Sequence, residues 1–121
     1  MSILTLTKEN FDQVIDENQI VFIDFWAQWC KPCLAFADTY QSVADENQDI
    51  VFAKIDIEKE TNLAHDFNVR SIPLLMVLKD CLAVFSETGT MPIEALRELV
   101  EQAKALDVSE LKKKVAEKEE G

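Results

Sequence analysis

The sequence predicts an α/β fold with a mixed β-sheet, because segments typical of strands alternate with segments typical of helices. Residues 20–27 form an apolar run that only Asp24 interrupts, rich in β-branched and aromatic side chains. Such a run is typical of a central, parallel strand buried on both faces. Residues 74–78 and 82–85 are separated by the short turn Lys79-Asp80-Cys81, which indicates an antiparallel hairpin. Parallel strands and a hairpin together make the sheet mixed.

The helices are predicted from their first residues and their apolar faces. Thr7 can cap the first helix, and Pro32 and Pro92 stand at favourable first-turn positions of two later helices. Apolar residues recur at helical spacing after each of these three residues. In chain order we expect a strand at 3–6, a helix at 7–18, a strand at 20–27, a helix at 32–47, a strand at 50–57, a helix at 58–66, the hairpin strands at 74–78 and 82–85, and a helix at 92–106.

Length and composition predict one domain with a polar tail. A chain of 121 residues with 48% apolar residues fits a single globular domain, which we place at residues 1–106. Residues 107–121 are expected to form a charged helical extension, with Ser109 as a candidate cap and Leu111, Val115 and Ala116 as apolar anchors. The three lysines at 112–114 are offset by five acidic residues in this tail, so they do not indicate a nucleic-acid site.

The net charge of −11 argues against nucleic acids and anionic membranes as partners, because both would repel the chain. No apolar run has the length of a membrane span. Residues 1–10 lack the basic start and apolar core of a signal peptide. We therefore expect a cytoplasmic protein that acts as a monomer.

Cys30-Lys31-Pro32-Cys33 is the motif that carries chemistry. Cys30 stands between a buried strand and a helix, whose unpaired N–H groups and dipole favour a thiolate and lower the pKa of Cys30. Cys33 lies one turn further on and should be more buried. A Cys30 thiolate can attack a substrate disulfide, and Cys33 can then resolve the mixed disulfide and leave a Cys30–Cys33 disulfide. The alternative is a metal site, for which one cysteine pair and a single histidine, His65, are a poor ligand set.

Three segments and one glycine resemble the thioredoxin family. Residues 22–33 (FIDFWAQWCKPC) resemble its active-site strand and loop, and residues 69–73 (VRSIP) resemble the segment that holds its cis-proline. Residues 52–56 (FAKID) resemble its third strand, and Gly89 falls where the family has its groove glycine. The match covers residues 3–106. It implies a thioredoxin-like α/β fold, with a five-stranded mixed sheet flanked by helices on both faces.

The resemblance also implies roles for the matching residues. Cys30 would be the nucleophile and Cys33 the resolving thiol. Asp24 would be a buried acid with a raised pKa that exchanges a proton with Cys33 through water, and Lys54 would counter its charge. Pro73 would be cis and face the cysteines, and the backbone of Ile72 would be free to pair with an extended substrate. The expected substrate-binding residues are Trp29, Lys31, Pro32, Ile72, Pro73 and Gly89.

The chain departs from the family pattern at five positions. Lys31 stands where glycine is common, and a cation there should stabilise the Cys30 thiolate and make the protein somewhat more oxidising. Asp38 replaces a helix-kinking proline, which puts the kink in doubt. Cys81 replaces a glycine of the hairpin turn, where a positive φ is often needed. Leu34 stands in place of a common lysine and Leu74 in place of the usual threonine.

Four residues have a second interpretation. Asp24 could be a surface acid on an edge strand, although its apolar neighbours favour burial. Lys54 could be a strand lysine with only its stem buried. Cys81 could be a regulatory thiol or incidental. Trp26 is better explained by packing, with Trp29 as the substrate contact.

The resulting hypothesis is a thiol–disulfide oxidoreductase that reduces protein disulfides through Cys30 and Cys33. By resemblance, its electrons would come from an NADPH-dependent thioredoxin reductase, and the chain itself would bind no cofactor and no metal. A chaperone or adaptor for one client, with redox chemistry secondary, is the rival function. An oxidase or isomerase use of the same dithiol is a nearer variant, which Lys31 motivates.

Overall fold

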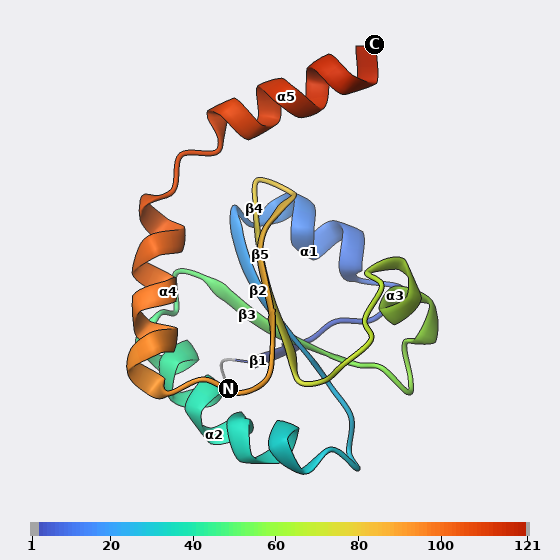
Figure 1. Ribbon diagram of the computed structural model, residues 1–121, viewed down its shortest axis with the longest axis vertical. Coiled ribbons are helices and arrows are strands. Elements are labelled where there is room, and N and C mark those ends of the chain that lie inside the picture. The colour runs from blue at the N-terminus through green and yellow to red at the C-terminus, as the bar shows by residue number, and fades with distance from the viewer. Residues whose placement is uncertain (1–2, 121) are drawn as a thin grey trace.

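The computed structural model describes residues 3–120. Strands and helices alternate until the final hairpin, as the sequence predicts (Figure 1). The elements are β1 (Ile3–Thr5), α1 (Phe11–Glu17), β2 (Ile20–Trp26), α2 (Lys31–Glu46), β3 (Val51–Asp56), α3 (Thr61–Asp66), β4 (Leu74–Lys79), β5 (Leu82–Thr88), α4 (Ile93–Ala105) and α5 (Ser109–Glu120).

The five strands form one mixed sheet in the order β1-β3-β2-β4-β5. β2 lies at the centre, which confirms the interpretation of its apolar run. It runs parallel to β3 and antiparallel to β4, so it is parallel on one side only. Five consecutive residues of β2, from Val21 to Phe25, are buried. β4 and β5 form the predicted antiparallel hairpin.

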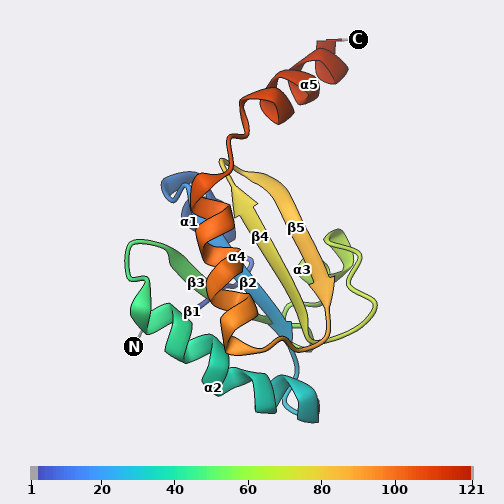
Figure 2. The same cartoon turned by 60° about the vertical axis from the view of Figure 1, so that its left-hand side comes forward.

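Helices cover both faces of the sheet, in agreement with the predicted fold. α2 and α4 lie on one face, and α1 and α3 lie on the other (Figures 1 and 2). Because side chains alternate along a strand, Phe22 points into the core under α2 and α4, whereas Ile23 points into the core under α1 and α3. Each face of the sheet therefore carries its own hydrophobic core.

Several helix boundaries differ from the sequence prediction. Thr7 does not cap the first helix: α1 begins at Phe11 after Asn10, whose side chain accepts a hydrogen bond from the Thr7 N–H at 2.8 Å and donates to the Thr5 carbonyl at 3.0 Å. Asn10 thus closes the turn before the helix. Pro92 precedes α4 as its N-cap. α3 begins at Thr61, because a turn follows β3.

The β4–β5 turn is shorter than the sequence predicts. Lys79 is the last residue of β4, not part of the turn, and its side chain is buried. Asp80 and Cys81 both have positive φ, 51° and 68°. This pair of left-handed residues is the geometry of a tight two-residue hairpin turn, which glycine or asparagine would adopt with less strain. The positive φ that the sequence analysis anticipates at Cys81 is therefore present.

α5 stands away from the body of the domain (Figures 1 and 2). It is held at its start, where Val108 is only 4% exposed and Lys112 forms a 3.4 Å ion pair with Asp80. The Asp107 carboxylate accepts hydrogen bonds from both the backbone N–H and the hydroxyl of Ser109, at 2.9 and 2.5 Å, so the Ser109 side chain acts as a donor to Asp107. Leu111 and Val115 are exposed, and the side chain of Ala116 lies outside the described residues. Within residues 3–120 no helix combines the length and apolarity needed to cross a membrane.

Candidate active site

Cys30 and Cys33 meet at the start of α2 and are joined by a disulfide, with Cα atoms 5.2 Å apart. Cys30 is the N-cap, and its Sγ accepts a hydrogen bond of 3.2 Å from the backbone N–H of Cys33. The first turn of a helix leaves such N–H groups without backbone partners. The same donor and the positive end of the helix dipole are placed to stabilise negative charge on Cys30 once the disulfide is reduced.

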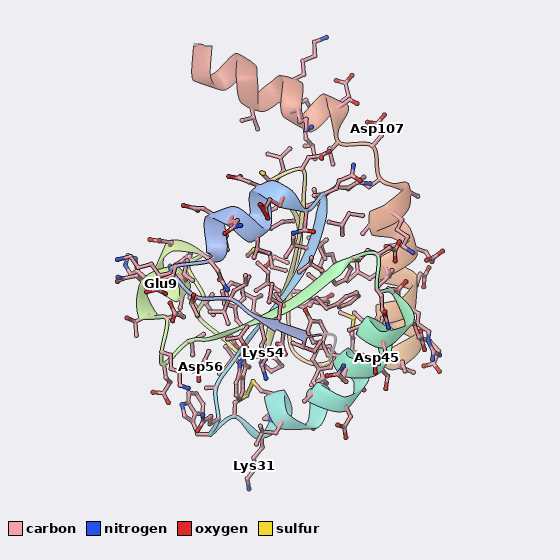
Figure 3. All side chains as sticks on the ribbon, turned by 180° about the vertical axis from the view of Figure 1, so that it is seen from behind. Glu9, Lys31, Asp45, Lys54, Asp56 and Asp107 are labelled. Atoms are coloured by element: carbon pink, nitrogen blue, oxygen red, sulfur yellow. A yellow bond between two sulfur atoms is a disulfide. The ribbon has the colours of Figure 1, made fainter. Side chains whose placement is uncertain are left out.

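The residues around the dithiol differ sharply in exposure. Cys30 and Cys33 are both nearly buried, at 4% and 2% exposure, so the expected difference between them is small in the disulfide form. Trp29 is 64% exposed. Pro32 is exposed as well, and Lys31 extends into solvent away from the domain (Figure 3). The dithiol thus sits just below a surface formed by the residues around it.

The loop before β4 approaches the dithiol from the other side. The Ile72–Pro73 peptide bond is cis, as the resemblance implies. Ile72 packs against the cluster formed by Ala27, Cys30 and Cys33. Its backbone forms no hydrogen bond among the described residues. The fold therefore brings together two segments that are about forty residues apart in the chain.

Gly89 joins this surface through the backbone. Its N–H donates a 2.8 Å hydrogen bond to the carbonyl of Pro73. Its φ is +95°, which side chains rarely allow, and a Cβ placed on it would meet no atom within 4 Å. Glycine is therefore required here by backbone conformation, not by close packing.

Asp24 and Lys54 face each other beneath the dithiol, on neighbouring residues of β2 and β3. Asp24 is 5% exposed, and its Oδ1 has no hydrogen-bond partner among the described residues. Burial raises the pKa of Asp24 to about 7, and the nearby charge of Lys54 partly opposes this rise. The direction of this pKa shift is the one that the sequence analysis expects for a buried acid.

Asp24 opens onto a cavity of about 360 Å³ between the sheet and α2, and Cys33 also lines this cavity. Its remaining walls are Ile3, Thr5, Trp26, Leu34, Ala37, Tyr40, Gln41 and Lys54. A cavity of this size can hold several water molecules. It provides a space through which water can connect the Asp24 carboxyl with the Cys33 sulfur.

Tyr40 is a member of this site that the sequence analysis does not single out. Its hydroxyl donates a hydrogen bond of 2.8 Å to the carbonyl of Ala53. Burial raises its pKa well above the usual value, and the charge of Asp24 adds to this effect. The signal in the sequence is a polar aromatic residue on the buried face of the predicted helix, which needs a hydrogen-bond partner.

Residues 2–102 match the family model described as "Thioredoxin". The chain belongs to the thioredoxin family. It is 46% identical over 118 residues to "Putative thioredoxin 2" of Streptomyces coelicolor, covering 98% of this chain and 88% of that protein. It is 39% identical over 101 residues to the thioredoxin of Bacillus subtilis, covering 83% and 96% respectively.

Solved thioredoxin structures share the fold. A mutant thioredoxin of Halobacterium salinarum superposes with a TM-score of 0.81 and 30% identity, covering 88% of this chain and 94% of that one. Thioredoxin f of spinach chloroplasts gives a TM-score of 0.78 and 28% identity, covering 86% and 95%. Membership of this family and the Cys30–Cys33 disulfide show that the protein is a thiol–disulfide oxidoreductase that reduces protein disulfides.

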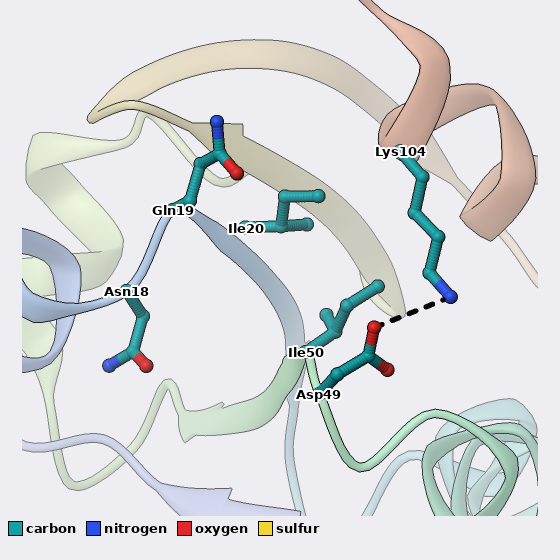
Figure 4. A pocket seen from close by; sticks show the side chains of 6 residues that line it. All are labelled: Asn18, Gln19, Ile20, Asp49, Ile50 and Lys104. Carbon is teal, nitrogen blue, oxygen red and sulfur yellow. Dashed lines mark ion pairs between the residues drawn. The ribbon is translucent and has the colours of Figure 1, made fainter.

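Other sites are less suited to this chemistry. A polar pocket of about 210 Å³ lies at the start of β2, at the strand end opposite the dithiol (Figure 4). Its two charged residues, Asp49 and Lys104, form a 3.5 Å ion pair with each other.

Cys81 lies on the hairpin turn, where burial and the nearby Asp16 raise the pKa of its thiol. Within the described residues, no group of three or more His, Cys, Asp or Glu side chains is arranged to hold a metal ion.

Proposed function

We propose that Cys30 is the attacking thiol of this reductase and Cys33 the resolving thiol. The Cys30 thiolate attacks one sulfur of a client disulfide, and the other client sulfur leaves as a thiolate and takes up a proton. Cys33, deprotonated, then attacks the Cys30 sulfur and releases the second client thiol. Two electrons pass to the client, and Cys30 and Cys33 end as a disulfide. The hydrogen bond from the Cys33 N–H to Cys30 Sγ supports this assignment, because it favours a thiolate on Cys30.

Asp24 is the proposed proton relay of the second step. Cys33 must lose a proton before it attacks, and the departing client thiolate must gain one. Asp24 and Cys33 line the same cavity, and a pKa of about 7 suits a group that both accepts and donates at neutral pH. Lys54 is proposed to limit how far burial raises the pKa of Asp24.

The proposed client surface surrounds the dithiol. Trp29, Pro32 and the stem of Lys31 offer exposed contact area on one side. On the other side, the unpaired backbone of Ile72 beside cis Pro73 suits an extended client segment that adds main-chain hydrogen bonds. Gly89 keeps the adjoining surface open, because nothing fills the space beside it.

We further propose that this monomer works in the cytoplasm and is reduced by an NADPH-dependent thioredoxin reductase. No cofactor is assigned to this chain: the redox-active group is the Cys30–Cys33 disulfide itself. In this proposal residues 1–106 carry the chemistry, and residues 107–121 are an extension. The family match over residues 2–102 supports that division.

The direct test is the reduction of insulin disulfides by dithiothreitol, followed by turbidity. The wild-type protein should accelerate it strongly, and Cys30→Ser should abolish the acceleration. Cys33→Ser should instead accumulate a mixed disulfide with the client through Cys30, visible by mass spectrometry. Cys81→Ser is the matched control, because it removes the remaining thiol without touching the dithiol. No acceleration by the folded wild-type protein would contradict the proposal.

An adaptor for a dedicated client remains the second candidate, because α5 stands off the domain with Leu111 and Val115 exposed. The double variant Cys30→Ser, Cys33→Ser separates the two functions. It should keep client binding and cellular function if the protein is an adaptor. It should lose function if disulfide reduction is the main role.

A further inference from the structure

The ammonium of Lys54 lies against the face of an aromatic ring. Its Nζ is 4.8 Å from the centroid of the Trp26 ring, a distance within the range of cation–π attraction. Lys54 pairs with Asp24 across β2 and β3, and Trp26 is two residues beyond Asp24 on the same face of β2. All three side chains line the cavity that also contains Cys33.

Lys54 is close to Asp24 without forming an ion pair with it. Among the residues whose side chains the structure describes, no ion pair includes Lys54 or Asp24. Asp24 Oδ1 receives no hydrogen bond from these residues. The Lys54 ammonium thus interacts with the ring of Trp26 and not with the carboxylate of Asp24. Trp26 itself packs against the cluster of Ala27, Cys30 and Cys33.

We propose that Trp26 is a positioning residue: its ring holds the Lys54 ammonium in the cavity, near Asp24 but out of contact with it, and thereby sets how readily Asp24 binds a proton. The mechanistic importance of this arrangement rests on the proposed function of Asp24 as a proton relay. The arrangement itself is a property of the folded protein and can be tested without turnover.

The position of the Lys54 ammonium matters because it sets the affinity of Asp24 for a proton, which would be unsuitable for a relay if it were very low or very high. A lysine in direct contact with Asp24 would keep the carboxylate ionised and unable to carry a proton. A lysine free in solvent would be screened, and burial alone would then favour the protonated acid. Lys54 held by Trp26 gives an intermediate affinity for the proton. From α2, Tyr40 faces Asp24 as a titratable group, and Cys33 faces it as part of the disulfide, which does not titrate. β4 presents Leu75 opposite Asp24.

The experiment is a double-mutant cycle with the pKa of Asp24 as its readout. Trp26→Phe keeps an aromatic ring, smaller than indole and with a weaker π face, and Lys54→Met removes the charge and keeps the stem. The carboxyl carbon of Asp24 is titrated by NMR in the oxidised forms of the wild type, both single variants and the double variant. Effects of Trp26 on the hydration of Asp24 appear in both backgrounds, so only the difference between the backgrounds reports action through Lys54.

With Lys54 present, Trp26→Phe should raise the pKa of Asp24 by about 0.5, because the ammonium spends more time in solvent. In the Lys54→Met background the same substitution should change it by less than about 0.2. Trp26→Leu removes the π face and should give a larger difference between the two backgrounds in the pKa change of Asp24. It takes the place of Trp26→Phe if Trp26→Phe folds poorly. Equal changes in both backgrounds, no change, or a fall that requires Lys54 would each overturn the role of Trp26.

The same variants separate this inference from the proposed function. If Asp24 relays protons, the pH dependence of mixed-disulfide resolution should move with the pKa of Asp24 across the cycle. If the NMR cycle gives the expected coupling but Asp24→Asn resolves mixed disulfides at the wild-type rate at every pH, the role of Trp26 stands and the relay fails. If the relay holds and the coupling is absent, Trp26 serves packing alone.

Discussion

The ammonium of Lys79, at the end of β4, donates a hydrogen bond of 2.6 Å to the backbone carbonyl of Leu106, just beyond α4. It also donates to the carbonyls of Ala103 and Lys104, at 2.7 and 3.1 Å. The last carbonyls of a helix lack backbone donors, and a cation there interacts favourably with the helix dipole. One buried side chain thus completes the end of α4 and fixes the segment from which α5 departs.

Lys79→Met should therefore lower the free energy of unfolding by about 2 kcal/mol, because the carbonyls lose their donor in a buried place. Urea unfolding followed by circular dichroism measures this as a fall in the midpoint at unchanged slope. Lys104→Met is the matched control, since it removes a nearby lysine whose 3.5 Å pair with Asp49 is exposed, and it should cost less than about 0.5 kcal/mol. Equal losses in both variants would contradict the structural role of Lys79.

The buried carboxyl of Asp24 should make stability depend on pH. Well below pH 4 the carboxyl is protonated in both the folded and the unfolded chain. As pH rises toward 7, the unfolded chain loses the proton while the folded protein, with a pKa of about 7, retains it, so the folded state is progressively disfavoured. Above that range both states are ionised and the penalty stays constant, at about 4 kcal/mol.

Asp24→Asn removes this titration. Its stability relative to wild type should therefore rise between about pH 4 and pH 7 and level off above pH 8. Urea unfolding of the oxidised proteins at three pH values across this window measures the difference. Asp38→Asn, on the exposed face of α2, should show no comparable trend. A difference for Asp24→Asn that is flat with pH would show that the buried carboxyl does not titrate near 7.

Lys31 should make the dithiol slightly more oxidising. Its charge lies beside Cys30 and stabilises a thiolate, but the side chain is exposed, so the effect is small and screened by salt. Lys31→Gly should lower the reduction potential by about 10 mV at low salt and by less at high salt, whereas Lys31→Arg should leave it unchanged. Equilibration with a glutathione redox buffer measures the potential.

The same measurement addresses the oxidase or isomerase variant of the function. A wild-type potential near the roughly −270 mV of thioredoxin is expected for a reductase. A value far above it would favour an oxidase, and an unchanged or raised potential in Lys31→Gly would contradict the electrostatic role of Lys31.

Truncation should separate the extension from the domain. Ending the chain after Val108 removes α5 and its solvent-accessible ion pair between Lys112 and Asp80. This truncation should lower the free energy of unfolding by less than about 1 kcal/mol and leave insulin reduction unchanged. Ending it after Leu106 also removes the buried Val108 and should cost about 1 kcal/mol more. A large loss of turnover on removing α5 alone would favour the adaptor function. Unfolding and turbidity assays report both quantities.

Much of the fold could be predicted from local sequence. Short local patterns predict three elements that the structure contains: the strand β2, the helix that begins beside Pro32, and the β4–β5 hairpin. The predictions that were wrong concern where helices begin and how long the hairpin turn is, which depend on single residues at the element ends. Thr7 and Asn10 are both good caps by residue type, and only the path of the chain from β1 decides that Asn10 closes the turn.

The dithiol and its setting could be predicted from local sequence, because the two cysteines are contiguous with the strand before them and the helix after them. Local sequence also identified Asp24 as a buried acid from its immediate neighbours. Contacts between distant groups became visible in the folded chain: Lys79 with the end of α4, Gly89 with Pro73, and Lys54 with the ring of Trp26. The physical reason is that burial follows a local period, whereas contacts between distant residues depend on strand order and register, which single-sequence patterns do not specify.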